Sequence, residues 1–353
     1  MAPEPKTGQP AYRLLLLLLL LLKLTPAAHC FSPAEAADIN QCVELAINHH
    51  YLEAIALFSG RLEDSLAYEN ASSAALAHFH IATVYAAWMQ DREDYARSDS
   101  YEYHLARTEQ ITDSLLLVEE DADLLFLRAG CSLYRSYLAK RRGQWWRMYL
   151  QGIDGVNRLE NLAAGYPDYR EVDLGLGNYL YWKSSLLQNL TWVPFIDDQR
   201  AEGIARLERA ATTGQFGRWL AVSNLTWIMM DYGQPEAALA WALRGREQFP
   251  DSRHFLFPLA QAQRQRGELA AADSLYSLLL EQLQADQQPS HYNEFYCLNK
   301  MVWINRELEH WPRALALRDS ALALPLTTAA RERLRKKISQ LELLPPSRRT
   351  EQP

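Results

Sequence analysis

Histidine is the first side chain to test for chemistry, because it binds metals and moves protons near neutral pH. The close pairs are His49-His50 and His78-Phe79-His80. Neither has the His-Glu-x-x-His spacing of a zinc site. Residues two apart on a helix point to different faces, so His78 and His80 are not expected to share a metal ion. The sequence therefore predicts surface or packed histidines and no metal site.

Other catalytic patterns are absent or incomplete. The sequence has no Gly-x-Ser-x-Gly elbow and no phosphate-binding loop, and Gly175-x-Gly177 lacks the third glycine of a dinucleotide site. The acidic run at 119–123 is interpreted as a helix start, where negative charge complements the helix dipole, with calcium binding as the alternative. We predict a protein that is not an enzyme and uses no cofactor. The alternative is an enzyme with a site between Trp192 and Asp198.

Composition narrows the class of partner. The chain has 353 residues, is 48% hydrophobic and carries a formal net charge of −7. It can therefore bury a core, and its acidity argues against nucleic-acid binding, which needs a positive surface.

The N-terminus predicts export. Lys6 and Arg13 precede the leucine run Leu14–Leu22, and small residues follow Lys23. This pattern is typical of a signal peptide, here residues 1–28, because the run is too short to span a bilayer. An uncleaved anchor and lipidation of Cys30 are alternatives. No later stretch approaches the length of a membrane span.

We expect the periplasm or envelope of a bacterium, with a eukaryotic secretory lumen as the alternative. The glycosylation patterns at Asn70, Asn189 and Asn224 are explained by chance. Cys42, Cys131 and Cys297 are too far apart in sequence to suggest a disulfide framework, and the last two are expected to be buried.

An internal repeat appears in the C-terminal half. Gly233 and Gly267 are 34 residues apart, as are Ala238 and Ala272, and Pro250 follows where a second helix would end. A glycine turn reverses one helix into the next, and a small alanine lets the two backbones approach closely. This period resembles that of tetratricopeptide (TPR) repeats.

Weaker copies extend the pattern along the chain. Ala54 and Phe58 mark a first repeat, and Ala314 with Pro325 marks a last one. Further helices are predicted from 145 and from 201, with Gly203 at a close helix contact, and a helical pair is expected over 73–118. Inserts are expected at 189–195 and 284–291. A final helix, 328–343, is predicted to cap the array.

The resemblance implies an all-α, TPR-like α-solenoid over residues 29–343, clearest at 219–325, followed by a disordered tail at 344–353. A narrower likeness, over Gly175–Tyr179 and onward to Gly203, is to the mitochondrial outer-membrane and inclusion-body-clearance TPR proteins and their bacterial relatives. It lends architecture and no function.

In TPR proteins the first helix of each pair, helix A, lines the concave face. Transferring those positions gives a groove rich in Trp, Tyr, Arg and Asn, the side chains that dominate protein-binding surfaces. The candidate groove residues are Trp227, Trp303, Arg264, Arg306, His254, Tyr296, Asn299, Tyr179 and Trp182. We predict a scaffold or adaptor that binds a protein or peptide segment there. The alternative is an envelope glycan or small-ligand binder that uses the aromatic stripe.

Overall fold

The computed structural model describes residues 32–63, 71–187 and 197–344. The predicted signal peptide, the insert at 189–195 and residues 345–353 of the predicted tail lie outside these ranges. Within them every regular element is an α-helix. The helices are α2 (Pro33–Ile47), α3 (Tyr51–Glu63), α4 (Ala71–Arg92), α5 (Ser98–Leu115), α6 (Ala122–Arg141), α7 (Trp145–Gly165), α8 (Val172–Leu187), α9 (Arg200–Thr213), α10 (Arg218–Asp231), α11 (Pro235–Gln248), α12 (Arg253–Gln265), α13 (Leu269–Asp286), α14 (Tyr292–Glu307), α15 (Trp311–Ala323) and α16 (Thr328–Glu342).

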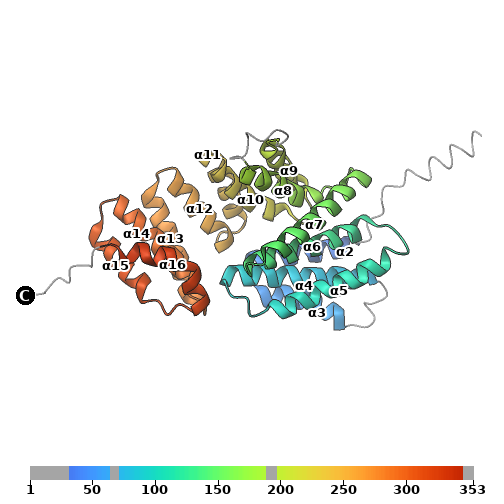
Figure 1. The fold of residues 1–353 in the computed structure, drawn as a ribbon, viewed down its shortest axis with the longest axis horizontal. Helices are drawn as coiled ribbons and strands as arrows, with labels where there is room; N and C mark the ends of the chain where they lie inside the picture. Colours follow the sequence, from blue (N-terminus) through green and yellow to red (C-terminus); the bar gives the residue numbers. More distant parts are fainter. Residues whose placement is uncertain (1–31, 64–70, 188–196, 345–353) are drawn as a thin grey trace, which may run out of the picture.

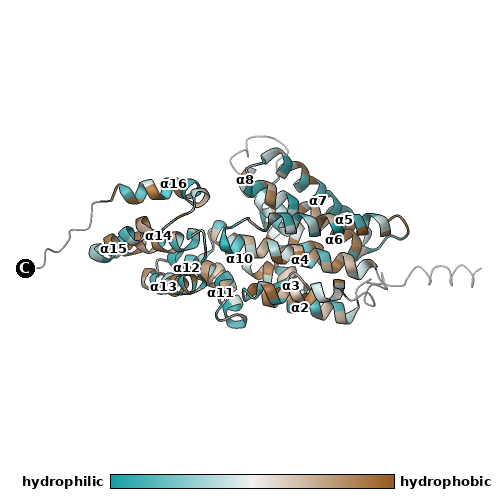
Figure 2. Cartoon of the chain, turned by 90° about the horizontal axis from the view of Figure 1, so that it is seen from below, coloured by the Kyte–Doolittle hydropathy of each residue, from teal (hydrophilic) through white to brown (hydrophobic). Residues whose placement is uncertain are grey.

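The helices stack as consecutive pairs. Each even-numbered helix from α2 to α14 packs on the helix that follows it, and each pair packs on the next, in the order of the chain (Figure 1). This is the predicted all-α solenoid of helix-turn-helix repeats. The helical pair expected over 73–118 is formed by α4 and α5. Hydrophobic and hydrophilic residues alternate around most helices (Figure 2), because each helix buries one stripe between its neighbours.

One backbone conformation recurs at the turns between paired helices. A residue with positive φ ends the first helix of six pairs, but only three of these residues are glycines. They are His49, Glu93, Gly143, Gly233, Gly267 and Glu309. The 34-residue glycine spacing therefore marks the α10/α11 and α12/α13 turns, whereas the same turn at His49, Glu93 and Glu309 carries no glycine.

Small residues set the spacing between helices, as predicted. Ala238 and Ala272 are fully buried. A Cβ atom on Gly203 would lie 2.7 Å from the carbonyl oxygen of Gly177, so α8 and α9 pack backbone to backbone at this point. The acidic run also behaves as predicted, since Asp121 caps α6 by accepting the Leu124 N–H at 3.0 Å.

The superhelix turns tightly enough for distant repeats to touch. Ser252, at the start of α12, donates a 2.6 Å hydrogen bond to the carbonyl oxygen of Ile47 in α2. Ser290, just before α14, donates to the carbonyl oxygen of Arg92 in α4 at 2.9 Å. Contacts between distant repeats therefore partly close the concave face, which was expected to form a curved groove.

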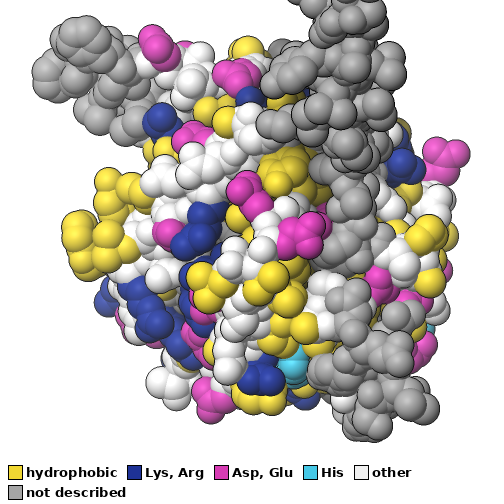
Figure 3. All heavy atoms as spheres, turned by 90° about the vertical axis from the view of Figure 1, so that its right-hand side faces the viewer, with side chains coloured by type: hydrophobic (Ala, Val, Ile, Leu, Met, Phe, Trp, Pro, Cys, Tyr) yellow, Lys and Arg dark blue, Asp and Glu magenta, His cyan; other side chains and the backbone are white. Residues whose placement is uncertain are grey.

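Charges are mixed on the end of the molecule that carries the α5–α6 loop. Figure 3 shows acidic, basic and hydrophobic side chains interspersed on that face. One example of this mixing lies between α5 and α6, where the half-buried Arg128 contacts Glu109 at 2.9 Å and the exposed Asp113 at 2.7 Å.

Candidate functional site

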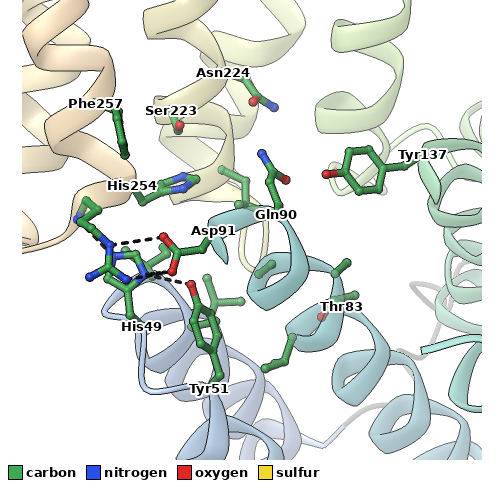
Figure 4. Close-up of a pocket in the computed structure, with 18 of the residues that line it drawn as sticks. His49, Tyr51, Thr83, Gln90, Asp91, Tyr137, Ser223, Asn224, His254 and Phe257 are labelled. Carbon is green, nitrogen blue, oxygen red and sulfur yellow. Dashed lines mark hydrogen bonds and ion pairs between the residues drawn. The ribbon is translucent and has the colours of Figure 1, made fainter. Parts of the chain in front are cut away.

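The concave face contains a pocket of about 640 Å³. Side chains from α2, α4, α6, α10, α12 and α14 line it, so the first helix of six of the seven pairs contributes (Figure 4). The expectation that helix A faces the concave surface is met in these six pairs. The exception is α8.

The pocket residues follow a register fixed by the turns. Six positions before the positive-φ residue stand Val43, Ala87, Tyr137 and Trp227, and nine positions before it stand Val84, Tyr134, Asn224 and Pro258. Because an α-helix repeats every 3.6 residues, these offsets share one face. The repeated turn therefore aims the same face of successive helices into one space.

The walls of the pocket are mainly apolar and aromatic. The aromatic lining residues include Trp227 of α10, Phe257 of α12 and Tyr296 of α14, together with Tyr134 and Tyr137 of α6. Surfaces of this kind release water on binding, and aromatic rings add contact area without much loss of conformational entropy.

A few neutral polar groups converge on this apolar space. Gln90, Ser223, Asn224 and His254 reach it from α4, α10 and α12 (Figure 4). Nε2 of His254 is buried and has no hydrogen-bond partner within the described residues. A buried polar atom without a partner costs free energy, so a ligand that bonds to it would gain affinity.

Several ionisable groups in the pocket are held neutral by burial. Burial lowers the pKa of His254 to about 4, and it raises the pKa of Cys42, Tyr134 and Tyr296 to about 12. In each case loss of solvent disfavours the charged form. The central part of the pocket therefore favours a neutral occupant.

The charges at the pocket lie at one edge, where they are paired. Arg253 of α12 donates to both carboxylate oxygens of Asp91 in α4, at 2.8 and 3.3 Å, and contacts Asp286 of α13 at 3.0 Å. His49 donates or accepts a 2.8 Å hydrogen bond with Tyr51 beside them. Burial raises the pKa of the Asp91 carboxyl, but the nearby His49 and Arg253 outweigh it and hold that pKa below its usual value.

This cluster, called the Asp91–Arg253 junction below, holds distant repeats together. The paired residues belong to the second and sixth helix pairs, and Arg253 N donates to Nε2 of His49 from the first turn at 3.1 Å. The junction is therefore a structural seam at the pocket edge and leaves no free charge for a ligand.

Three of the nine predicted groove residues line the pocket, namely Trp227, His254 and Tyr296. Two others lie on α8, which is not part of the lining: Trp182 is 39% exposed, and Tyr179 packs against the core of α6 to α8.

The remaining four lie on α12 and α14, away from the pocket. Arg264 pairs with Glu307 at 3.0 Å, and the Arg306 guanidinium lies 5.1 Å from the ring centre of Trp303. Trp303 itself packs on the core shared with α16, and Asn299 is buried. A binding role for any of the nine stays a prediction.

The N-terminal half of the lining was missed by sequence reasoning. Thr83, Gln90 and Tyr137 come from helices whose repeat frame the sequence did not reveal. The signal that could have placed them is the turn itself, since Tyr137 precedes Gly143 by the same six residues that separate Trp227 from Gly233. The α4 turn, at Glu93, has no such glycine to mark it.

Within the described residues no group of three or more His, Cys, Asp or Glu side chains could hold a metal ion. The predicted separation of His78 and His80 is seen, since His78 faces His104 and His80 stacks on Phe58. Three cysteines, Cys42, Cys131 and Cys297, are free and buried. No helix among these residues is long and apolar enough to cross a membrane.

Comparison with known proteins adds little to this geometry. No protein-family model matches the chain, and no curated protein matches it. Among solved structures the chain is similar to PilW, described as a widely conserved type IV pilus biogenesis factor. The two share 16% identity over 72% of this chain and 98% of that chain, with a TM-score of 0.44. The superposition is too loose to support an argument about function.

Proposed function

We propose that this chain is a non-enzymatic, exported helical-repeat protein that binds a short segment of another protein in the pocket on its concave face. The observation that carries the proposal is the pocket itself. Six helices present apolar and aromatic walls there, and Gln90, Asn224 and His254 supply neutral hydrogen-bonding groups. An extended peptide offers the matching chemistry, with apolar side chains and neutral backbone amides.

The volume of the pocket limits what enters it. About 640 Å³ is the size of a site for a small molecule and accommodates only a few side chains of a peptide. A long helix would occupy far more than this volume. The proposed occupant is therefore a short anchor segment whose flanks lie outside.

A second candidate is a small neutral ligand or a sugar, whose apolar face would stack on an aromatic ring. The volume of the pocket favours this candidate, because about 640 Å³ is within the range of small-molecule sites. Export to a bacterial envelope is proposed on the N-terminal sequence alone.

The test is affinity capture of the tagged chain from extract of its native cell envelope, with the variant Trp227→Ala. Trp227 is 38% exposed and lines the pocket, so its loss removes contact area without emptying a core position. If Trp227 anchors the segment, we expect about 30-fold weaker binding, the effect of losing a typical hot-spot side chain.

Trp311→Ala is the matched control, because Trp311 is 42% exposed on α15 and lies outside the pocket lining. A partner that is retained by Trp311→Ala and lost by a folded Trp227→Ala protein supports the proposal. A partner that binds both variants equally contradicts it. Titration of tryptophan fluorescence with oligosaccharides then tests the second candidate, which predicts a change that Trp227→Ala abolishes.

A further inference from the structure

The corner between α6 and α7 exposes a cluster of large apolar side chains. Trp145, Trp146, Tyr149 and Leu150 are 64%, 71%, 52% and 49% exposed. The rings of Trp146 and Tyr149 stack with their centres 5.7 Å apart. Exposed aromatic groups of this size, side by side on a surface, mark an interaction site.

The core does not account for these side chains. The buried residues of α7 begin only at Gly155, ten positions after its first residue, and none of the four exposed side chains lines the pocket. The first two turns of α7 therefore present their apolar side chains to the outside, and the cluster is independent of the proposed pocket function.

Positive charge surrounds the cluster. The sequence contains no Asp or Glu from 124 to 153, although the whole chain carries a net charge of −7. Lys140, Arg142 and Arg147 are exposed there. Among the described residues no ion pair is formed by Lys140 or Arg147, and Arg142 only approaches Glu102 at 3.9 Å.

The C-terminal helix adds to this basic region. Arg141, at the end of α6, and Arg333, on α16, both pair with Glu93 at the end of α4. The Glu93 carboxylate therefore bridges the end of α6 and α16. On α16, Arg331 and Lys336 are also exposed. The corner, defined here as residues 140–150, thus has apolar rings at its centre and a basic edge.

We propose that the α6–α7 corner docks on an anionic phospholipid bilayer surface. Trp and Tyr prefer the interface between water and hydrocarbon, where the ring is in an apolar layer and its polar edge stays wet. Lys and Arg beside them bind the phosphates of anionic lipids. Residues 140–150 contain three exposed basic side chains and no Asp or Glu, which favours a negatively charged partner. A bilayer provides one without a matching pocket.

The experiment measures quenching of tryptophan fluorescence by brominated phospholipids in vesicles of phosphatidylglycerol. The full chain includes Leu14–Leu22, which can insert by itself, so the readout must be local to the corner. We expect wild-type fluorescence to be quenched and the Trp145→Phe/Trp146→Phe variant to lose that quenching, since Phe keeps the apolar contact and removes the reporter. Trp311→Phe, an exposed tryptophan on α15, should leave it unchanged.

The charge requirement is tested with Lys140→Gln/Arg142→Gln/Arg147→Gln. Each charge removed should shift the equilibrium between docked and free corner about fivefold toward free. Vesicles of phosphatidylcholine should quench the wild type weakly. The proposal is overturned if the phenylalanine variant is quenched like the wild type, or if neutral and anionic vesicles act alike. It is also overturned if crosslinking from position 149 captures a protein while lipids quench nothing.

Discussion

At the scale of single residues, the Asp91–Arg253 junction is the most consequential polar cluster. Arg253 is 7% exposed and satisfies carboxylates from α4 and α13 at once. Removing one partner of a buried ion pair leaves the other charge buried and uncompensated, which costs far more than the pair contributes when intact. The sequence offered no hint of this pairing, because the partners are 162 positions apart.

We therefore expect Arg253→Leu to lower the free energy of unfolding by about 3–5 kcal/mol. Arg313→Leu is the control, since Arg313 also contacts an aspartate, Asp273, at 2.9 Å but is 54% exposed. An exposed pair contributes about 1 kcal/mol or less. Urea unfolding followed by circular dichroism gives both values. Equal losses in the two variants would show that the junction is not a buried seam.

At the scale of elements, the sequence predicted most helices and their pairing. The 34-residue spacing identified α10 to α13, and apolar periodicity identified the pair at 73–118. The sequence marked a first and a last repeat, but it did not give the frame of α4 and α6, so their pocket residues Gln90 and Tyr137 were missed. The turn after α4 uses Glu93 in a conformation that sequence reasoning associates with glycine. Trp227 was predicted, because its repeat carries Gly233 in the 34-residue frame.

The turns also give a stability prediction. Glu309 has a φ of 61° between α14 and α15, a left-handed conformation that strains any residue with a Cβ atom. Glu309→Gly should therefore stabilise the protein by about 0.5–1 kcal/mol. Gly267, with a φ of 81° and open space around its Cα, occupies the equivalent turn. Gly267→Ala should destabilise the protein by about 1 kcal/mol. Thermal unfolding should therefore show a higher Tm for Glu309→Gly and a lower Tm for Gly267→Ala.

At the scale of the whole molecule, contacts between distant repeats shape the pocket, and packing between helices sets the response to acid. The distant contacts depend on small rotations accumulated from pair to pair, which no local pattern encodes. Packing keeps several imidazoles away from water. His254 lies in the pocket, His78 faces His104 and Arg107, and His80 stacks on Phe58. Burial, the main cause in each case, lowers their pKa values to about 4, about 4 and about 3.

These shifts predict acid destabilisation well above the range in which carboxylates titrate. Above the unfolded pKa of about 6.5 the histidines are neutral in both states, and their contribution to stability is complete. As the pH falls below 6.5, these histidines become protonated in the unfolded chain but stay neutral in the folded chain. This difference persists until the pH reaches their folded pKa values. Each histidine then removes up to about 1.4 kcal/mol of stability per pH unit. Urea midpoints measured across this window should fall steadily, and His80→Leu, which cannot titrate, should make the slope shallower. An unchanged slope in that variant would mean that His80 reaches solvent in the folded protein, and with it that the first two helix pairs open under native conditions.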